Sequence, residues 1–290
     1  MTSVEAARAT STTSATSATS ATSGTGNDEG AGRESASLVE VFASAQGEGP
    51  EVGRTTVFVR FGGCDLRCRW CDSPGTWRPT PGYRIETSAG SESFEEFENP
   101  VDLSWLIDRI DTLAPTPSTW ISLTGGEPLL QPEAIAFVAK GLSALGRRSY
   151  LETHGLHADA LASCVEDIDL ISMDWKFASD VQMGPSVVRP PGEDFHDAHE
   201  RFLRVAQRAG SVYVKAVLTP STTDDEIDAM IDRIERVSRD IPVVLQPVTP
   251  NAGVKEMPGS QRLLAVLARV EARLTDVRLI PQTHPIYGVL

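Results

Sequence analysis

The sequence is short of basic residues and has no long apolar run. It carries 26 Lys and Arg against 40 Asp and Glu, which gives a formal net charge of −14. A nucleic-acid-binding protein normally presents a net basic face, so this balance argues against nucleic acid as a partner. No window approaches the roughly 18 consecutive apolar residues that a membrane-spanning helix needs. We therefore expect no membrane association.

Cysteine is also scarce, with four in the chain. Three of them crowd into residues 64–71, whereas Cys164 stands alone. The N-terminus lacks the apolar core of a secretory signal, so we expect a reducing, cytoplasmic compartment rather than disulfides. Clustered cysteines in that setting predict binding of a metal or cofactor.

Composition divides the chain into a tail and one domain. Residues 3–26 are almost all Ser, Thr, Ala and Gly, which predicts a disordered tail over residues 1–35. Residues 36–290 are enough to bury the core of a single domain. Within it, residues 74–100 are expected to form one long irregular, acidic insertion, and we interpret its acidic part as a solvated loop.

Apolar patterning in the domain alternates between short runs and helical stripes. Helical spacing predicts helices at residues 132–145, 223–238 and 260–273. Strands are expected at residues 55–60, 119–123, 149–152, 169–173, 212–218, 243–246 and 277–280. Strands separated by helices imply an α/β fold with a mainly parallel sheet. Six or seven strands are too few for an eightfold barrel, so an open sheet and a partial barrel both fit.

Polar clusters follow these strands, in the order GGCDLRCRWC, TGGEP, ETHG, DWK and QPVTP. The carboxyl ends of parallel strands meet at one edge of a sheet, where active sites form. In the first cluster, Cys64, Cys68 and Cys71 make a Cys-x3-Cys-x2-Cys array. Structural zinc and ordinary four-iron clusters generally take four protein ligands. A four-iron cluster with one open iron matches three ligands; zinc completed by a distant His, or three unrelated buried cysteines, remain alternatives.

The array, with Trp70 before its last cysteine, resembles the cluster motif of the radical S-adenosylmethionine (SAM) superfamily. Residues 125–128 (GGEP) resemble a second element of that superfamily, whose backbone groups and carboxylate, here that of Glu127, hold the SAM ammonium. The resemblance implies a partial (β/α)6 TIM-like barrel and a 4Fe–4S cluster on Cys64, Cys68 and Cys71. The open iron would chelate SAM, and reduction of the cluster would release a 5′-deoxyadenosyl radical.

Residues 40–77, which include AQGEG and CDSPGTW, look like the opening of the 7-carboxy-7-deazaguanine synthase family. The resemblance extends to Gln282. Members of that family are lyases that convert 6-carboxy-5,6,7,8-tetrahydropterin to 7-carboxy-7-deazaguanine with loss of ammonia, in queuosine and deazapurine biosynthesis. The resemblance implies a 4Fe–4S cluster, SAM and Mg²⁺ as cofactors, an electron donor such as flavodoxin or ferredoxin, and a homodimer.

The same resemblance assigns site residues. SAM would be contacted by Trp70, Cys71, Asp72, Gly126, Asp174, Trp175, Lys176, Gln246, Pro247 and Val248. The pterin would be contacted by Ala45, Gln46, Gly47, Arg60 and Thr124. The planar guanidinium of Arg60 suits the substrate carboxylate, although a structural ion pair at the sheet edge is the alternative. Ser73 stands where the family usually has the Thr that ligates Mg²⁺; serine keeps the hydroxyl but loses the methyl that restricts its rotamer.

Several residues depart from the family or fall outside its motifs. The family often ends on Gln-x-His-Lys, whereas here Pro285 follows His284, so we assign no contact to the chain terminus. His196 and His199 are expected on a solvated helix face, and His154 could approach SAM. Trp105 is expected in a helix core and Cys164 as a small buried residue.

Two functional alternatives remain. One is a radical SAM activase that acts on a glycine of another protein, and the other is a non-catalytic iron–sulfur or zinc-binding module. The QGEG element and Arg60 favour a small polar substrate over a polypeptide. The lack of a second cysteine cluster in the sequence argues against members with auxiliary iron–sulfur centres.

Overall fold

The computed structural model describes residues 34–184 and 194–288. The predicted disordered tail lies outside these residues except for Glu34 and Ser35, and Ser35 already belongs to a short strand, β1 (Ser35–Ala36), paired with β7 (Val101–Asp102). No helix in the described part is long and apolar enough to cross a membrane.

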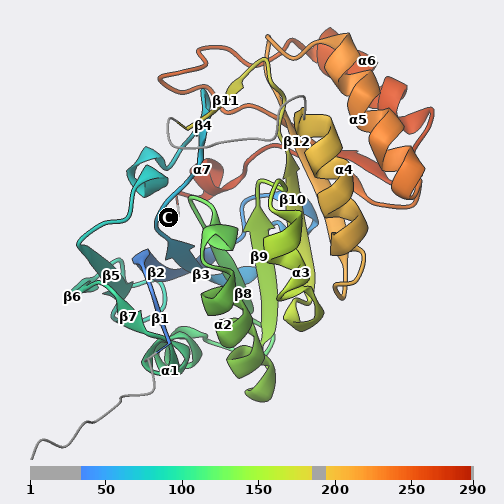
Figure 1. The fold of residues 1–290 in the computed structure, drawn as a ribbon. Helices are drawn as coiled ribbons and strands as arrows, with labels where there is room; N and C mark the ends of the chain where they lie inside the picture. Colours follow the sequence, from blue (N-terminus) through green and yellow to red (C-terminus); the bar gives the residue numbers. More distant parts are fainter. Residues whose placement is uncertain (1–33, 185–193, 289–290) are drawn as a thin grey trace, which may run out of the picture. The chain divides into compact units, whose positions relative to one another are not determined.

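A ten-stranded sheet organises the domain, in the order β14-β13-β12-β10-β9-β8-β3-β2-β5-β6 (Figure 1). From one edge to the other these strands are β14 (Val277–Leu279), β13 (Val243–Pro247), β12 (Val212–Leu218), β10 (Leu170–Trp175), β9 (Arg148–Thr153), β8 (Trp120–Gly125), β3 (Thr55–Phe61), β2 (Leu38–Ala45), β5 (Gly82–Glu86) and β6 (Phe94–Glu98). All neighbours from β14 to β3 run parallel. The predicted α/β class with a mainly parallel sheet is confirmed.

Helices connect the parallel strands and cover one face of the sheet (Figure 1). They are α1 (Leu103–Leu113), α2 (Pro132–Ala144), α3 (Ala158–Ala162), α4 (Phe195–Ala206), α5 (Asp224–Val237) and α6 (Ser260–Glu271). The three predicted helices correspond to α2, α5 and α6, and α5 begins with a capping box of Thr223 and Glu226. Each of the six parallel strands from β3 to β13 is followed along the chain by one of these helices before β14 is reached. These six β/α units agree with the predicted partial barrel.

The candidate site lies on the face of the sheet away from the helices. Because side chains alternate along a strand, every second residue points to this face, and these residues from neighbouring strands form layers. Near the amino ends of the strands, a separate apolar cluster consists of Trp120, Tyr150, Leu170, Tyr213 and Val244. Two residues further along each strand come Ser122, Glu152, Ser172, Lys215 and Gln246, all buried or nearly so. The apolar layer therefore closes the amino end, and the polar layer forms the floor of a space that opens at the carboxyl end.

The expectation of an irregular insertion at residues 74–100 is wrong. After a short 3-10 turn, η2 (Pro74–Trp77), strands β5 and β6 form an antiparallel pair that extends the sheet beyond β2. Tyr83 and Phe97 stack across this pair at 5.5 Å, so aromatic contacts hold a segment whose many acids suggested a loop. Trp105 lies edge-on to Phe97 and is 36% exposed, so it is not in a helix core as expected.

Candidate active site

A cavity of about 340 Å³ lies at the carboxyl ends of the parallel strands. Most of the predicted site residues line it together: Ala45, Gln46, Gly47, Arg60, Cys64, Cys68, Trp70, Cys71, Asp72, Ser73, Thr124, Gly126, Asp174, Lys176 and Gln246. These residues come from β2, β3, β8, β10, β13 and the loops that follow them. The fold therefore gathers into one place residues that lie as far apart in the chain as Ala45 and Gln246.

Three predicted SAM contacts do not line this cavity. Trp175 faces the helices because it alternates with Asp174 on β10. Its ring packs against that of His199 with the ring centres 4.7 Å apart, and its indole Nε1–H donates to His196 Nδ1 at 3.1 Å. Only the backbone of Trp175 is left for a cofactor contact. Pro247 ends β13, and Val248 packs against Trp70 from behind.

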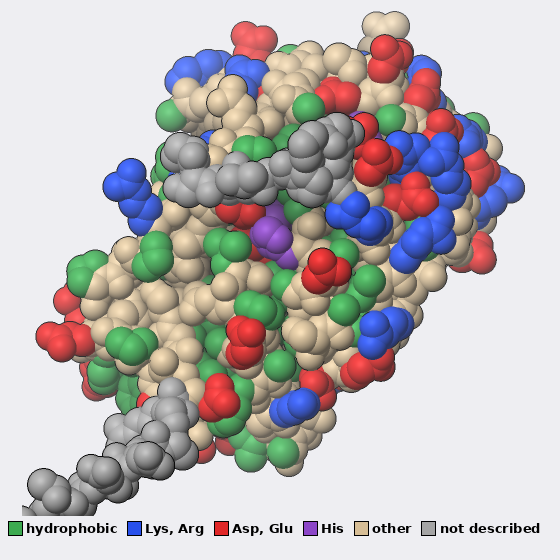
Figure 2. Space-filling view, viewed as in Figure 1, with side chains coloured by type: hydrophobic (Ala, Val, Ile, Leu, Met, Phe, Trp, Pro, Cys, Tyr) green, Lys and Arg blue, Asp and Glu red, His purple; other side chains and the backbone are tan. Residues whose placement is uncertain are grey.

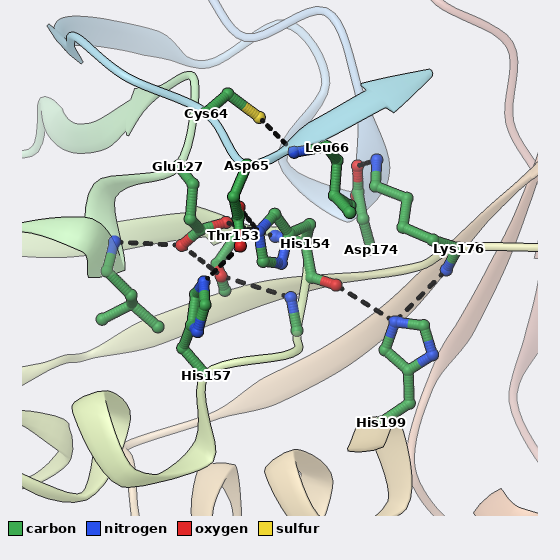
Figure 3. Close-up of polar contacts among 12 residues, drawn as sticks. Cys64, Asp65, Leu66, Glu127, Thr153, His154, His157, Asp174, Lys176 and His199 are labelled. Carbon is green, nitrogen blue, oxygen red and sulfur yellow. Dashed lines mark hydrogen bonds and ion pairs between the residues drawn. The ribbon is translucent and has the colours of Figure 1, made fainter. Parts of the chain in front are cut away.

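The three clustered cysteines are free thiols on a loop whose middle part, β4 (Leu66–Cys68), pairs with β11 (Val181–Met183). The backbone N–H of Leu66 points at Cys64 Sγ at 3.5 Å (Figure 3). Burial raises the pKa of Cys64 to about 12 and also raises that of Cys68, so a metal centre there must displace their protons. Cys164 is buried in the turn that follows α3, as expected, and cannot supply a fourth ligand.

The Gly-Gly turn after β8 packs directly on the cysteine loop. A Cβ at Gly126 would lie 2.1 Å from the carbonyl oxygen of Gly63 and 2.9 Å from Cys64 Cβ, so only glycine permits this approach. The Glu127 carboxylate, however, is fully buried and accepts hydrogen bonds from the backbone N–H groups of Leu129 and His154. It does not line the cavity, contrary to the expectation that it holds the SAM ammonium.

A buried ion-pair network that the sequence analysis missed crosses the cavity floor. Lys215, on β12, pairs with Glu48 of the QGEG element and with Asp174 Oδ1 at 3.1 Å. Burial would raise the pKa of Glu48, but Lys215 outweighs it and holds that pKa below its ordinary value. Lys176 Nζ donates to Asp174 Oδ2 at 2.7 Å and lies 4.3 Å from the centre of the Trp70 ring.

Glu152, on β9, is a second residue that sequence reasoning did not single out. It accepts hydrogen bonds from Ser122 Oγ at 2.6 Å and Gln46 Nε2 at 3.2 Å, and it lines the cavity. Burial raises its pKa. One signal could have found Lys215, a charged residue inside the otherwise apolar predicted strand at residues 212–218, where a side chain must have a buried partner. Glu152 ends the predicted strand at residues 149–152 and begins the ETHG cluster, so its place at a strand end was the corresponding signal.

The ion pair at the sheet edge that was the alternative for Arg60 is present, and the side chain also lines the cavity. Its Nε donates to Glu40 Oε1 at 3.0 Å, which is the ion pair at the sheet edge, and Arg84 binds the other oxygen of the same carboxylate. The guanidinium also lies 5.7 Å from the centre of the Phe42 ring and lines the cavity. Glu40 and Phe42 thus hold the cation in place at the cavity wall.

The expectation that His196 and His199 lie on a solvated helix face is wrong for His199, which is fully buried. Its Nε2 lies 3.1 Å from the carbonyl oxygen of His154 and 3.4 Å from the backbone nitrogen of Lys176, which follows Trp175 at the end of β10. The ring therefore joins α4 to the ends of two central strands.

Lowering the pH from 7.5 to 5.5 is expected to destabilise the protein through His199. Burial lowers the pKa of this residue well below its ordinary value, so the folded chain keeps the ring neutral. The unfolded chain binds a proton there as the pH falls through about 6.5, which reduces the free energy of unfolding by up to about 1.4 kcal/mol per pH unit below that point. Urea unfolding at both pH values should show a smaller decrease for His199→Gln than for the parent. Equal decreases would contradict this prediction.

Comparison with known proteins identifies the family of the chain. A model described as the radical SAM superfamily matches residues 58–234, and the chain belongs to that superfamily. The chain is 36% identical over 272 residues to a 7-carboxy-7-deazaguanine synthase of Geobacter sulfurreducens, covering 89% of this chain and 99% of the relative. It is 34% identical to the enzyme of that name from Methanopyrus kandleri, over 88% and 95% of the two chains. Within the superfamily, the chain belongs to the 7-carboxy-7-deazaguanine synthase family.

Solved structures show the same fold at low sequence identity. QueE from Escherichia coli has a TM-score of 0.52 and 20% identity, covering 85% of this chain and 94% of its own. A radical SAM methyltransferase from Sphaerobacter thermophilus has a TM-score of 0.54 and 14% identity, covering 84% and 77%. These likenesses concern the fold. The family membership rests on the sequence relatives, and it supports the lyase over the activase and the non-catalytic module.

Proposed function

We propose that this chain is a radical SAM lyase that converts 6-carboxy-5,6,7,8-tetrahydropterin to 7-carboxy-7-deazaguanine with loss of ammonia. The observation that carries the proposal is that a single cavity holds both sets of predicted residues, the cysteine loop with its glycine turn and the Gln46, Arg60 and Thr124 set. A cofactor bound at the first set therefore meets a small polar molecule bound at the second.

The residues present fit a 4Fe–4S cluster with an open iron. Three free thiols face one cavity, one of them within reach of a backbone N–H donor, and the glycine turn packs closely against their loop. When bound, the cluster supplies the electron with which SAM cleavage begins. Asp174 and Lys176 offer SAM a carboxylate and an ammonium, and Trp70 offers it an aromatic face.

The opposite wall suits a carboxylated pterin. The guanidinium of Arg60 provides a fork for the carboxylate. The amino-pyrimidine edge of a pterin presents N–H donors, for which the Glu152 carboxylate and the Gln46 amide offer acceptors. An electron donor of the flavodoxin or ferredoxin type and a homodimer are proposed from family membership.

The decisive experiment is anaerobic turnover. Protein with a reconstituted cluster is incubated with the carboxytetrahydropterin, SAM, a reductant and Mg²⁺, and the products are separated by liquid chromatography. Formation of 7-carboxy-7-deazaguanine together with 5′-deoxyadenosine supports the proposal. Cleavage of SAM without a deazaguanine product would show that the substrate is wrong.

Mg²⁺ is proposed to bind at Ser73, which lines the cavity between the cysteine loop and η2. The carbonyl oxygen of Ser73, rather than its hydroxyl, accepts the hydrogen bonds from Thr76, at 3.0 Å from N and 2.8 Å from Oγ1. The hydroxyl oxygen is a hard ligand of the kind that Mg²⁺ takes together with waters and substrate oxygens.

Ser73→Ala is expected to abolish the stimulation of product formation by Mg²⁺ while the iron content stays unchanged. Loss of one ligand should weaken the apparent Mg²⁺ affinity by about tenfold or more. Titration of Mg²⁺ in the turnover assay measures this, and Ser73→Thr serves as the control because it keeps the hydroxyl. If Ser73→Ala shows the Mg²⁺ dependence of the parent, Ser73 is not a ligand.

A further inference from the structure

A second group of potential metal ligands lies directly behind the cysteine loop. Asp65, the residue after Cys64, faces two histidines that follow β9: His154 Nε2 lies 2.8 Å from Oδ1, and His157 Nε2 lies 3.0 Å from Oδ2 (Figure 3). One ligand atom from each of the three residues lies within 4.8 Å of the others. One carboxylate and two imidazoles are a ligand set that suits zinc rather than magnesium or calcium.

The charge around this group also calls for a cation. Glu127 Oε2 lies 3.3 Å from His154 Nε2, so two carboxylates converge on one imidazole. Asp65 is 11% and Glu127 0% exposed at the side chain, and their only ion-pair partners within the described residues are the two histidines. Buried carboxylates in proteins are paired with a cation or coordinate a metal. Two carboxylates and two neutral imidazoles together balance the charge of a divalent ion.

The exposure of the group also allows a metal ion to reach it from solvent. The His157 side chain is 29% exposed, which gives a route from solvent. In the space-filling view, histidine reaches the molecular surface on the face that is drawn (Figure 2). We propose that Asp65, His154 and His157 bind a zinc ion, with water or Glu127 in the fourth position. Such an ion would fasten the start of the cysteine loop to the end of β9, next to the iron–sulfur cluster but without a sulfur ligand.

The test measures zinc in the cluster-loaded, full-length protein. Chelator-washed protein is given Zn²⁺ under anaerobic conditions, desalted, and analysed for iron and zinc by mass spectrometry. We expect about one zinc beside about four irons per chain, and a zinc X-ray absorption spectrum that fits nitrogen and oxygen at about 2.0–2.1 Å with no sulfur at about 2.3 Å. Both readouts are independent of turnover, so they do not depend on the proposed reaction.

Two variants and one control decide the site. His157→Gln and Asp65→Asn should lower zinc affinity at least about tenfold. His157→Gln should leave the iron content unchanged, because it lies outside the cysteine loop. His196→Gln, on α4, should bind zinc like the parent. The proposal fails if the parent retains no zinc, if the spectrum contains a Zn–S shell, or if both variants bind zinc as the parent does.

Discussion

Cys68→Ala is expected to lose the iron–sulfur cluster and to reduce product formation by more than about a hundredfold, since loss even of groups that only support a metal ligand costs tenfold to a hundredfold. Cys68 lies on β4 at the cavity wall with Cys64 and Cys71. With three protein thiols for four irons, each thiol has no substitute. Iron and sulfide analysis after anaerobic reconstitution, together with the turnover assay, measures the effect.

Cys164→Ala is the matched control for this prediction. Cys164 is the fourth cysteine of the chain, and its thiol donates to backbone carbonyl oxygens of its own helical segment. This variant should keep the iron content and the turnover of the parent. Loss of iron from Cys164→Ala, or full iron retention in Cys68→Ala, would show that the cluster does not rest on the residue 64–71 loop.

Lys215→Met is expected to lower the free energy of unfolding by about 3 kcal/mol, because removing one partner of a buried ion pair leaves uncompensated charge. Lys215 is the cation that Glu48 and Asp174 share on the cavity floor. Asp174 keeps Lys176 as a partner, whereas the side-chain partners left to Glu48 among the described residues are the neutral amides of Gln246 and Gln282. The loss should therefore act mainly through Glu48, and urea denaturation measures it.

Two further variants make this prediction specific. Lys140 pairs with Asp167 at 3.7 Å and is 66% exposed, so Lys140→Met should change the free energy of unfolding by well under about 1 kcal/mol. Adding Glu48→Gln to Lys215→Met should restore part of the lost stability, since it removes the orphaned charge. If Lys215→Met and Lys140→Met have equal effects, the buried network contributes no more than a surface pair.

The sequence predicts those parts of the site that depend on short stretches of chain. Spacing alone indicated that Cys64, Cys68 and Cys71 share one loop, and the GGEP motif indicated the turn that packs against this loop. The parallel strands and the helices α2, α5 and α6 followed from apolar periodicity, which reports burial within a segment. The prediction of an irregular insertion at residues 74–100 failed because it relied on the acidic composition of a segment that forms the hairpin of β5 and β6.

Alternation along a strand shows which residues share a face, but it does not show which face meets the cavity. Asp174 and Trp175 are neighbours on β10 but face opposite sides of the sheet. Asp174 faces the cavity, and Trp175 faces the helices. The prediction for His199 failed because the sequence does not show which side of a helix is packed. Its neighbours in the sequence are charged, and only the packing of α4 on β10 buries it.

By itself, the sequence determined the chemistry: three thiols in one loop, a glycine turn, and a family whose members share both. Only the tertiary structure decided which distant residues complete the site. Glu48 and Lys215 are 167 positions apart in the chain. They meet because the QGEG turn lies against the cavity face of the sheet, level with Lys215, the middle residue of β12. The position of the turn along β12 depends on strand register and on the apolar layer beneath it, and both come from packing across the whole sheet.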